Sequence, residues 1–176
     1  MINFRKATEK DIESIVNIYM DVHTMEEKGI TSTGWQREVY PTRDTVLSAI
    51  DRDDMFVIED DQGVCVCGVI NKIQVDVYEG AKWENEASSD QVTVLHTLAV
   101  SPSSWGKGYG RLFVKYYEEY AIKTNSPYLR MDTNETNRRA RAMYKSLGYK
   151  EIGIVPCKFN GIDGVNLVLL EKKVNR

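Results

Sequence analysis

The stretch that decides the fold is LHTLAVSPSSWGKGYGRLFVKYY, from Leu95 to Tyr117. It begins inside an apolar, β-branched run over residues 92–100 that is typical of a buried strand. Three glycines follow at positions 106, 108 and 110, and a helical pattern opens directly after them. Glycine lets the backbone approach a ligand closely, and the first amides of a helix carry partial positive charge. The order strand, glycine-rich turn and helix therefore predicts an anion site that suits a phosphate or a diphosphate.

The glycines alone do not identify the ligand. A dinucleotide fingerprint needs a glycine where Arg111 stands, and it needs an acidic residue after a second strand, about 20 residues further on, which is missing here. The phosphate-loop pattern that ends in Gly-Lys-Ser/Thr is also absent from this stretch. A flexible turn beside two cations, Lys107 and Arg111, remains the alternative for this segment.

A second motif lies downstream in NRRARAMYKSLGY, residues 137–149. Asn137, Ala140 and Tyr144 are spaced three and four apart, so they share one face of a predicted helix that Gly148 ends. With the two motifs in this order, the chain resembles the GCN5-related N-acetyltransferase (GNAT) superfamily, and it is similar to uncharacterised bacterial acetyltransferases. In that family the motif Arg/Gln-x-x-Gly-x-Gly/Ala binds the pyrophosphate of acetyl-CoA. Here Trp105 stands in its first position, so one side-chain contact differs.

The resemblance implies acetyl-CoA as cosubstrate, no metal, and two strands, 92–100 and 128–132, that splay apart around the pantetheine arm. It implies that Tyr144 stabilises the departing thiolate and that a backbone N–H near Leu98 stabilises the carbonyl oxygen. Asn137 is expected to contact the pantetheine arm, to cap its helix, or both. The cofactor-binding residues that the resemblance implies are Leu98, Ala99, Val100, Trp105, Gly106, Lys107, Gly108, Tyr109, Gly110, Arg111, Asn137, Ala140 and Tyr144.

The reaction that the resemblance implies is direct attack of a small-molecule primary amine on the thioester in a ternary complex. An alkyl amine with a pKa near 10.4 is mostly protonated at pH 7, at a cost of roughly 4.6 kcal/mol, so a base is expected. His96 is the first candidate because it lies on the strand that should line the site, and Glu84 and Glu86 are the alternatives. A buried structural histidine and a solvated loop are the corresponding non-catalytic interpretations.

The acceptor site is predicted in irregular segments that carry aromatic residues and acids, a combination that suits a cationic amine. Loops that are packed by their own aromatic side chains are the alternative. The candidate acceptor-binding residues are Trp35, Tyr40, Tyr78, Trp83 and Glu84.

The remaining segments predict an α/β fold with a mixed, mostly antiparallel central sheet of about seven strands and helices on both faces. This is the GNAT fold that the resemblance implies, in one domain over residues 1–176. Gly68 predicts a bulge within its strand, and residues 76–91 predict a long polar loop. The strands are predicted at residues 2–6, 55–59, 64–75, 92–100, 128–132, 149–157 and 165–171, and the helices from Thr8 to about Lys28 and at 43–52, 108–123 and 137–147.

Composition and charge exclude several classes. A net charge of −3 gives no reason to expect nucleic-acid binding. No apolar run approaches the roughly 18 residues of a membrane span. There is no signal-peptide pattern, and three cysteines without metal or redox spacing indicate reduced thiols in a cytoplasmic protein. The sequence leaves the oligomeric state open, with a homodimer as one option. The alternative functions are a CoA-binding regulatory module without turnover and a generic nucleotide-binding domain.

Overall fold

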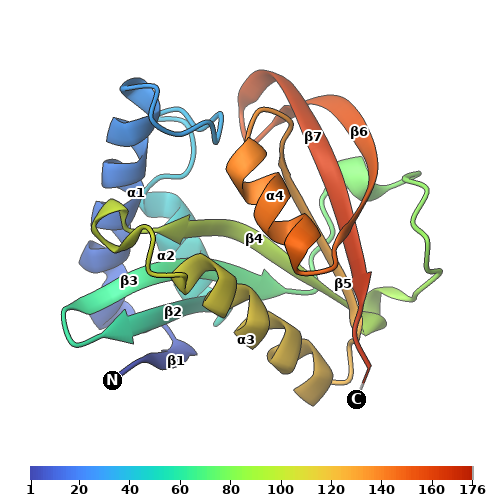
Figure 1. Cartoon of the computed structure of the whole chain (residues 1–176), viewed down its shortest axis with the longest axis horizontal. Coiled ribbons are helices and arrows are strands. Elements are labelled where there is room, and N and C mark those ends of the chain that lie inside the picture. Colours follow the sequence, from blue (N-terminus) through green and yellow to red (C-terminus); the bar gives the residue numbers. More distant parts are fainter. Residues whose placement is uncertain (176) are drawn as a thin grey trace.

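The computed structural model describes residues 1–175, and its strands form one seven-stranded sheet in the order β1-β2-β3-β4-β5-β7-β6 (Figure 1). The strands are β1 (Asn3–Lys6), β2 (Met55–Asp60), β3 (Gly63–Asn71), β4 (Val92–Val100), β5 (Tyr128–Asn134), β6 (Lys150–Phe159) and β7 (Ile162–Lys173). Only the neighbours β4 and β5 pair in parallel, whereas the other pairs are antiparallel. The predicted mixed, mostly antiparallel sheet is therefore confirmed.

Helices cover both faces of this sheet. On one face, α1 packs through Ile15, Tyr19 and Val22 against β2 and β3, together with the shorter α2. On the other face, α3 contributes Phe113 and Tyr117 to the largest cluster of buried side chains, which α4 joins. The helices are α1 (Ile12–Glu27), α2 (Arg43–Asp51), α3 (Tyr109–Lys123) and α4 (Arg138–Ser146).

Two predicted strand boundaries were wrong by more than two residues. The third strand was expected to run to residue 75, but β3 ends at Asn71 because the Asn71 side chain accepts the Ile73 N–H and turns the chain out of the sheet. The last strand, β7, is longer than predicted because its additional residues pair with β5 and β6. On α2, Val46 and Ala49 are buried, whereas Leu47 is 40% exposed.

The polar segment 76–91 is ordered rather than structureless. It contains two short 3₁₀ helices, Asp76–Tyr78 and Ser89–Gln91. The Trp83 ring stacks on the Arg130 guanidinium, 4.2 Å from its centroid, and Arg130 in turn forms a buried ion pair with Glu171. A carboxylate oxygen of Glu171 also accepts the Glu84 N–H at 2.7 Å. The segment is thus fastened to the sheet through a buried charge pair.

The predicted bulge lies opposite Gly68, on β4 and not on the glycine's own strand. In the β3–β4 ladder Cys67 pairs with Ala99 and Val69 pairs with His96, so β4 carries one extra residue between them. Thr97, within this bulge, has φ +51°. Gly68 is required for a different reason, because a Cβ there would lie 2.8 Å from the Phe113 ring. The glycine therefore allows α3 to approach the sheet closely, and the bulge bends β4.

Among residues 1–175, no helix has the length and apolar content that crossing a bilayer requires. The three cysteines are free thiols, with Cys65 and Cys67 buried and Cys157 half-buried. Burial raises the pKa of the Cys65 thiol to about 11 and that of the Cys67 thiol to about 12, so both are protonated at neutral pH.

Candidate active site

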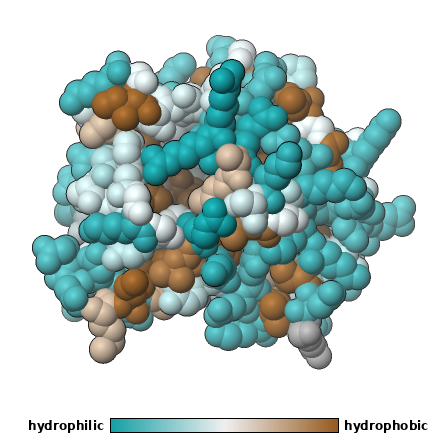
Figure 2. Space-filling view, in the orientation of Figure 1, coloured by the Kyte–Doolittle hydropathy of each residue, from teal (hydrophilic) through white to brown (hydrophobic). Residues whose placement is uncertain are grey.

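One elongated cavity of about 470 Å³ joins the start of α3 to the bulge of β4 and to the β6–β7 hairpin. Its volume is within the usual range for ligand sites, about 300–1,000 Å³. The space-filling view shows apolar surface in a recess between hydrophilic side chains near the middle of this face (Figure 2). The cavity therefore has room for an extended ligand and a smaller second one.

The glycine-rich turn forms one end of the cavity. Gly106 and Gly108 have φ +82° and +80°, and a Cβ on either would project into open space. Gly108 is the N-cap of α3, so the first amides of a four-turn helix face this end without internal partners. Arg111 lines the wall, whereas Lys107 does not and instead lies 4.0 Å from Asp60. This geometry is compatible with the predicted anion site, with Arg111 but not Lys107 on its wall.

Trp105, the residue that replaces the family's Arg or Gln, is anchored in the wall. Its indole N–H donates to the Val100 carbonyl at 3.0 Å, and the Arg139 guanidinium lies 5.3 Å from its ring centroid. Arg139 also lines the cavity. The sequence prediction missed this second cation, although its place in the first turn of α4 could have indicated it.

The middle of the cavity is the gap between β4 and β5. Their parallel pairing covers Val92–Leu95 and Tyr128–Met131 and then stops. Beyond this point Leu98, Ala99 and Val100 line the cavity, with their backbone unpaired on the β5 side. The splayed strands that the family resemblance implied are therefore present. A ligand chain in this gap can pair with the free edge of β4, as an added strand does.

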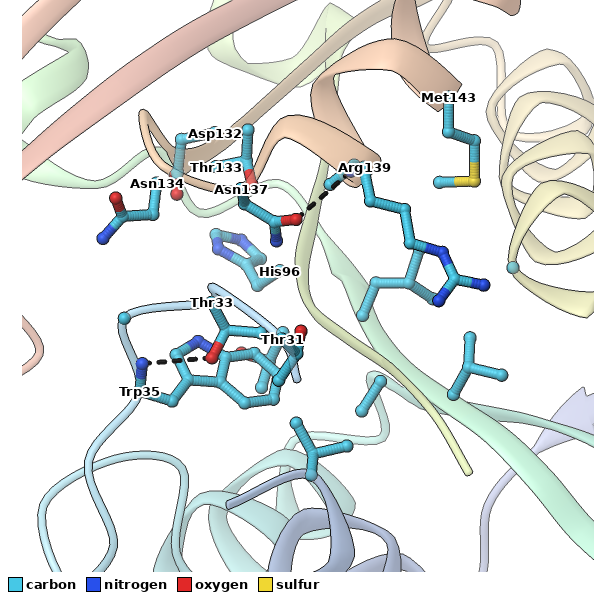
Figure 3. Close-up of a pocket in the computed structure, with 18 of the residues that line it drawn as sticks. Thr31, Thr33, Trp35, His96, Asp132, Thr133, Asn134, Asn137, Arg139 and Met143 are labelled. Carbon is cyan, nitrogen blue, oxygen red and sulfur yellow. Dashed lines mark hydrogen bonds between the residues drawn. The ribbon is translucent and has the colours of Figure 1, made fainter. Parts of the chain in front are cut away.

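His96 and Asp132 are the first residues past the last paired positions of β4 and β5, and both line the cavity (Figure 3). The His96 Nε2 atom lies 2.9 Å from the Asn71 Oδ1 atom, which already accepts the Ile73 N–H. Nε2 therefore carries the proton, and Nδ1 keeps the lone pair. Burial lowers the pKa of His96 to about 4 in spite of the nearby Asp54 carboxylate, so its ring is neutral at pH 7 and is a weak base.

Asn137 and Tyr144 lie on α4, on the cavity wall. The Asn137 side chain accepts the Ala140 N–H at 3.2 Å, so it is the helix cap, and the rest of its amide faces the cavity. Tyr144 is 6% exposed and packs edge-on against Tyr149. Burial raises the pKa of Tyr144, and the Asp132 carboxylate raises it further. Its hydroxyl is therefore a proton-bearing donor at neutral pH.

The predicted acceptor residues divide into two groups. Trp35 and Tyr40 line the cavity with their rings 6.4 Å apart and perpendicular, and the Tyr40 hydroxyl contacts the Thr97 hydroxyl. Tyr78, Trp83 and Glu84 do not reach the cavity wall: Tyr78 is buried behind it, Trp83 covers Arg130, and Glu84 pairs with Lys150 at 2.5 Å. The alternative base Glu86 is likewise outside the lining.

Asp132 is, besides Arg139, a charged residue of this cavity that the sequence analysis did not select. It lies at the carboxyl end of β5, beside the parallel β4, which is where sites form in parallel sheets. Its carboxylate accepts the Tyr78 hydroxyl at 2.7 Å. Burial raises the pKa of Asp132 to about 6, while the Tyr78 hydrogen bond works in the opposite direction. An acidic residue at the carboxyl end of a strand that pairs in parallel with its neighbour is the sequence signal that could have identified Asp132.

Solved structures share this architecture. An acetyltransferase of the GNAT family from Streptococcus agalactiae superposes with a TM-score of 0.82 at 24% identity, over 99% of this chain and 96% of that one. A GNAT-family acetyltransferase from Bacillus cereus gives 0.69 at 20% identity, over 100% and 99%. The ribosomal-protein-S18-alanine N-acetyltransferase from Escherichia coli gives 0.69 at 15% identity, over 100% and 96%. The class that these structures define is a GNAT-type α/β fold.

Sequence comparison leads to the same class. An uncharacterized N-acetyltransferase of Methanocaldococcus jannaschii is 28% identical over 96 residues, which are 54% of this chain and 42% of that relative. The matched part thus spans less than half of the relative. The sequence profile described as Acetyltransferase (GNAT) family matches residues 12–149, most of the chain. The chain belongs to the acetyltransferase (GNAT) family.

Proposed function

We propose that this protein is an N-acetyltransferase that moves the acetyl group of acetyl-CoA to a primary amine of a small molecule, in one domain and by direct attack in a ternary complex. The observation that carries the proposal is the continuity of one cavity, from the N-terminus of α3 through the β4–β5 gap to Tyr144 and His96. An anion site, a strand edge and a proton donor lie along it in the order in which diphosphate, pantetheine and thioester sulfur occur in acetyl-CoA.

The cosubstrate supplies an acetyl thioester, and the residues present suit it. The amides that follow Gly108 and the guanidinium of Arg111 would bind the diphosphate, with Arg139 as a further cation beside them. The free edge of Leu98–Val100 would pair with the pantetheine amides, and the Asn137 amide would add a contact. A Cβ on Gly106 or Gly108 would fill space that the diphosphate needs.

The chemistry needs a donor for the carbonyl oxygen. The bulge leaves Thr97 and Leu98 without partners in the β3–β4 register, which frees backbone N–H groups at this point of β4. We assign the Leu98 N–H as the donor to the developing oxyanion. Thr97 holds a backbone conformation that costs a β-branched residue about 1–3 kcal/mol, and the contact with Tyr40 keeps it there.

Protons balance as follows. The protonated amine must lose one proton before its nitrogen forms the bond to the carbonyl carbon, and a second as that bond becomes an amide. The C–S bond breaks, and the thiolate receives one proton. The first proton leaves to solvent before attack, because a base with a pKa of about 4 is too weak to take it from an alkylammonium. His96, which is neutral at pH 7, is assigned as the acceptor of the second proton, which becomes acidic once the nitrogen is bonded to the carbonyl carbon. The departing thiolate takes its proton from solvent.

Tyr144 is assigned to the thiolate. Because its pKa lies above the ordinary tyrosine value, complete proton transfer to a thiolate of pKa about 8.5 is uphill. Its role is therefore a charge-assisted hydrogen bond that strengthens as the sulfur gains charge, which is how an enzyme favours the transition state over the ground state.

A thiol-release assay with purified protein, acetyl-CoA and a broad panel of primary amines tests the function. Release that depends on an amine, together with the acetylated amine in mass spectra, is the expected result. Tight calorimetric binding of CoA without acyl transfer to any amine would instead indicate a CoA-binding module without turnover.

A further inference from the structure

The end of the cavity beyond the bulge is a compartment whose walls are mainly apolar, with uncharged polar side chains such as Thr33, Asn134 and Asn160 among them. The irregular segment 30–41 supplies two aromatic rings, and the β6–β7 hairpin supplies the opposite wall. Asp132 is the one acidic residue in the cavity lining, and it lies where these walls meet the β4–β5 gap. The apolar wall residues are Trp35, Tyr40, Val75, Phe159, Ile162, Val165 and Leu167.

The Asp132 carboxylate is held in place but not neutralised. Tyr78, which is 3% exposed, donates its hydroxyl proton to one oxygen at 2.7 Å. Within residues 1–175, Asp132 forms no ion pair with a lysine or arginine side chain. The nearest buried cation on its strand, Arg130, already pairs with Glu171. Tyr78 therefore fixes the direction of the carboxylate and leaves its charge uncompensated.

The titratable groups around Asp132 do not supply the missing charge. Each phenol or thiol that interacts with this carboxylate has a raised pKa, chiefly because of burial, so these groups are neutral at pH 7. The buried His96 ring is neutral as well, because burial lowers its pKa. The interacting groups are Tyr40, Tyr78, Tyr144 and Cys157. The two arginines of the lining, Arg111 and Arg139, lie at the other end beside the glycine-rich turn and Trp105. A carboxylate in such a place favours a ligand that brings a cation.

Resting on the proposed function, we propose that Asp132 recognises the acceptor by binding its protonated amine, and that the acceptor is a monoamine with an apolar skeleton. The ammonium group would sit against the carboxylate at the mouth of the β4–β5 gap, and the skeleton would pack between the aromatic rings and the β6–β7 hairpin.

The charges in the compartment select against two other kinds of amine. An amino acid would bring a second carboxylate next to Asp132, and no cation of the lining lies at this end to receive it. A polyamine would place its second ammonium against uncharged walls, since the cavity lining holds one acid, Asp132. Binding of either an amino acid or a polyamine would therefore cost the free energy of burying an unpaired charge.

Matched amine pairs test the selection on the whole chain with acetyl-CoA. We expect kcat/KM for 2-phenylethylamine to exceed that for phenylalanine by about 100-fold, and hexylamine to exceed 1,6-diaminohexane by about tenfold. A short peptide with a free N-terminal alanine should be a poor acceptor. Equal or reversed rates within the pairs, or preference for the peptide, would overturn the recognition while leaving acetyl transfer intact.

Variants test the residue. In Asp132→Asn, kcat/KM for 2-phenylethylamine should fall about 100-fold, chiefly through KM, while acetyl-CoA affinity is retained. Asp163→Asn, a change of an exposed residue near the start of β7, is the matched control and should keep the wild-type rate. Tyr78→Phe tests whether the Tyr78 hydroxyl positions the Asp132 carboxylate or only packs behind the cavity. Because the Tyr78 hydrogen bond lowers the pKa of Asp132, its loss should move the acid limb of the kcat/KM profile upward from about 6.

Calorimetry separates the two proposals. Binding of 2-phenylethylamine to the CoA complex of the wild type but not of Asp132→Asn supports the recognition, even where no thiol is released. Equal binding to both proteins contradicts it, whatever the turnover.

Discussion

Asp132→Asn is expected to stabilise the protein while it lowers kcat/KM for the amine. The side chain is half-buried at the wall of a cavity, and burial raises its pKa from 3.8 to about 6. A difference of about two pH units corresponds to about 3 kcal/mol of unfavourable free energy for the ionised form. Solvent in the cavity screens part of this, so the expected gain in the free energy of unfolding is about 1–3 kcal/mol at pH 7.5. Asparagine keeps an oxygen for the Tyr78 hydroxyl.

The sign of the effect depends on pH in a defined way. Between about pH 4 and pH 6 the folded protein keeps the Asp132 proton that the unfolded chain loses, so folded protein binds more protons and its stability falls as the pH rises. Above pH 6 the loss is constant. The asparagine variant lacks this loss, so its advantage should be near zero below pH 4 and complete above pH 6.5.

Urea unfolding at a series of pH values measures this difference, with Asp163→Asn as the control for a surface change, expected to lie within about 0.5 kcal/mol of wild type. A variant that is less stable than wild type at pH 7.5, or an advantage that does not change between pH 4 and pH 7, would show that the Asp132 carboxyl is not strained in the folded protein. Gain of stability with loss of activity is the usual mark of a functional group.

Three further substitutions test other parts of the structure. Tyr144→Phe should lower kcat about 10- to 100-fold through loss of a hydrogen bond to charged sulfur, with the calorimetric affinity for CoA unchanged; an unchanged kcat would remove Tyr144 from the mechanism. Gly108→Val should abolish CoA binding because its φ of +80° strains any other residue and its side chain would enter the anion site, and retained affinity would contradict that site. Glu171→Gln should destabilise the fold by about 3 kcal/mol in urea because it leaves Arg130 buried without its counter-ion, and a loss below about 1 kcal/mol would refute the role of this pair.

Much of the fold could be predicted from local patterns. The glycine-rich turn and the start of α3 are determined within about ten residues, since backbone freedom and the orphan amides act locally. The same holds for the capping of α4 by Asn137. These positions depend on neighbours along the chain, which a sequence displays directly.

The acceptor compartment could not be predicted in the same way. The orientation of Asp132 depends on a hydrogen bond from Tyr78, which is 54 residues away in the sequence. Its place in the cavity depends on where the β4–β5 pairing ends, which is a tertiary property. Trp83 and Glu84 show the converse error in location: their segment looked like an acceptor loop, but a buried ion pair between β5 and β7 fastens it outside the cavity. The bulge was predicted on the strand of Gly68 but lies on β4, because the register between two strands depends on the residues of both.

The contact between Tyr40 and Thr97 has a consequence for altering this protein. It links the segment that forms one wall of the acceptor compartment to the bulge whose amides are assigned to the thioester oxygen. Changes in residues 30–41 that aim at a new acceptor would therefore also disturb the rate of the chemical step. The opposite wall, with Phe159 and Ile162, belongs to a hairpin that pairs with β5 rather than with β4. Laboratory evolution toward a new amine should begin on that hairpin, where substitutions can change acceptor specificity without slowing acetyl transfer.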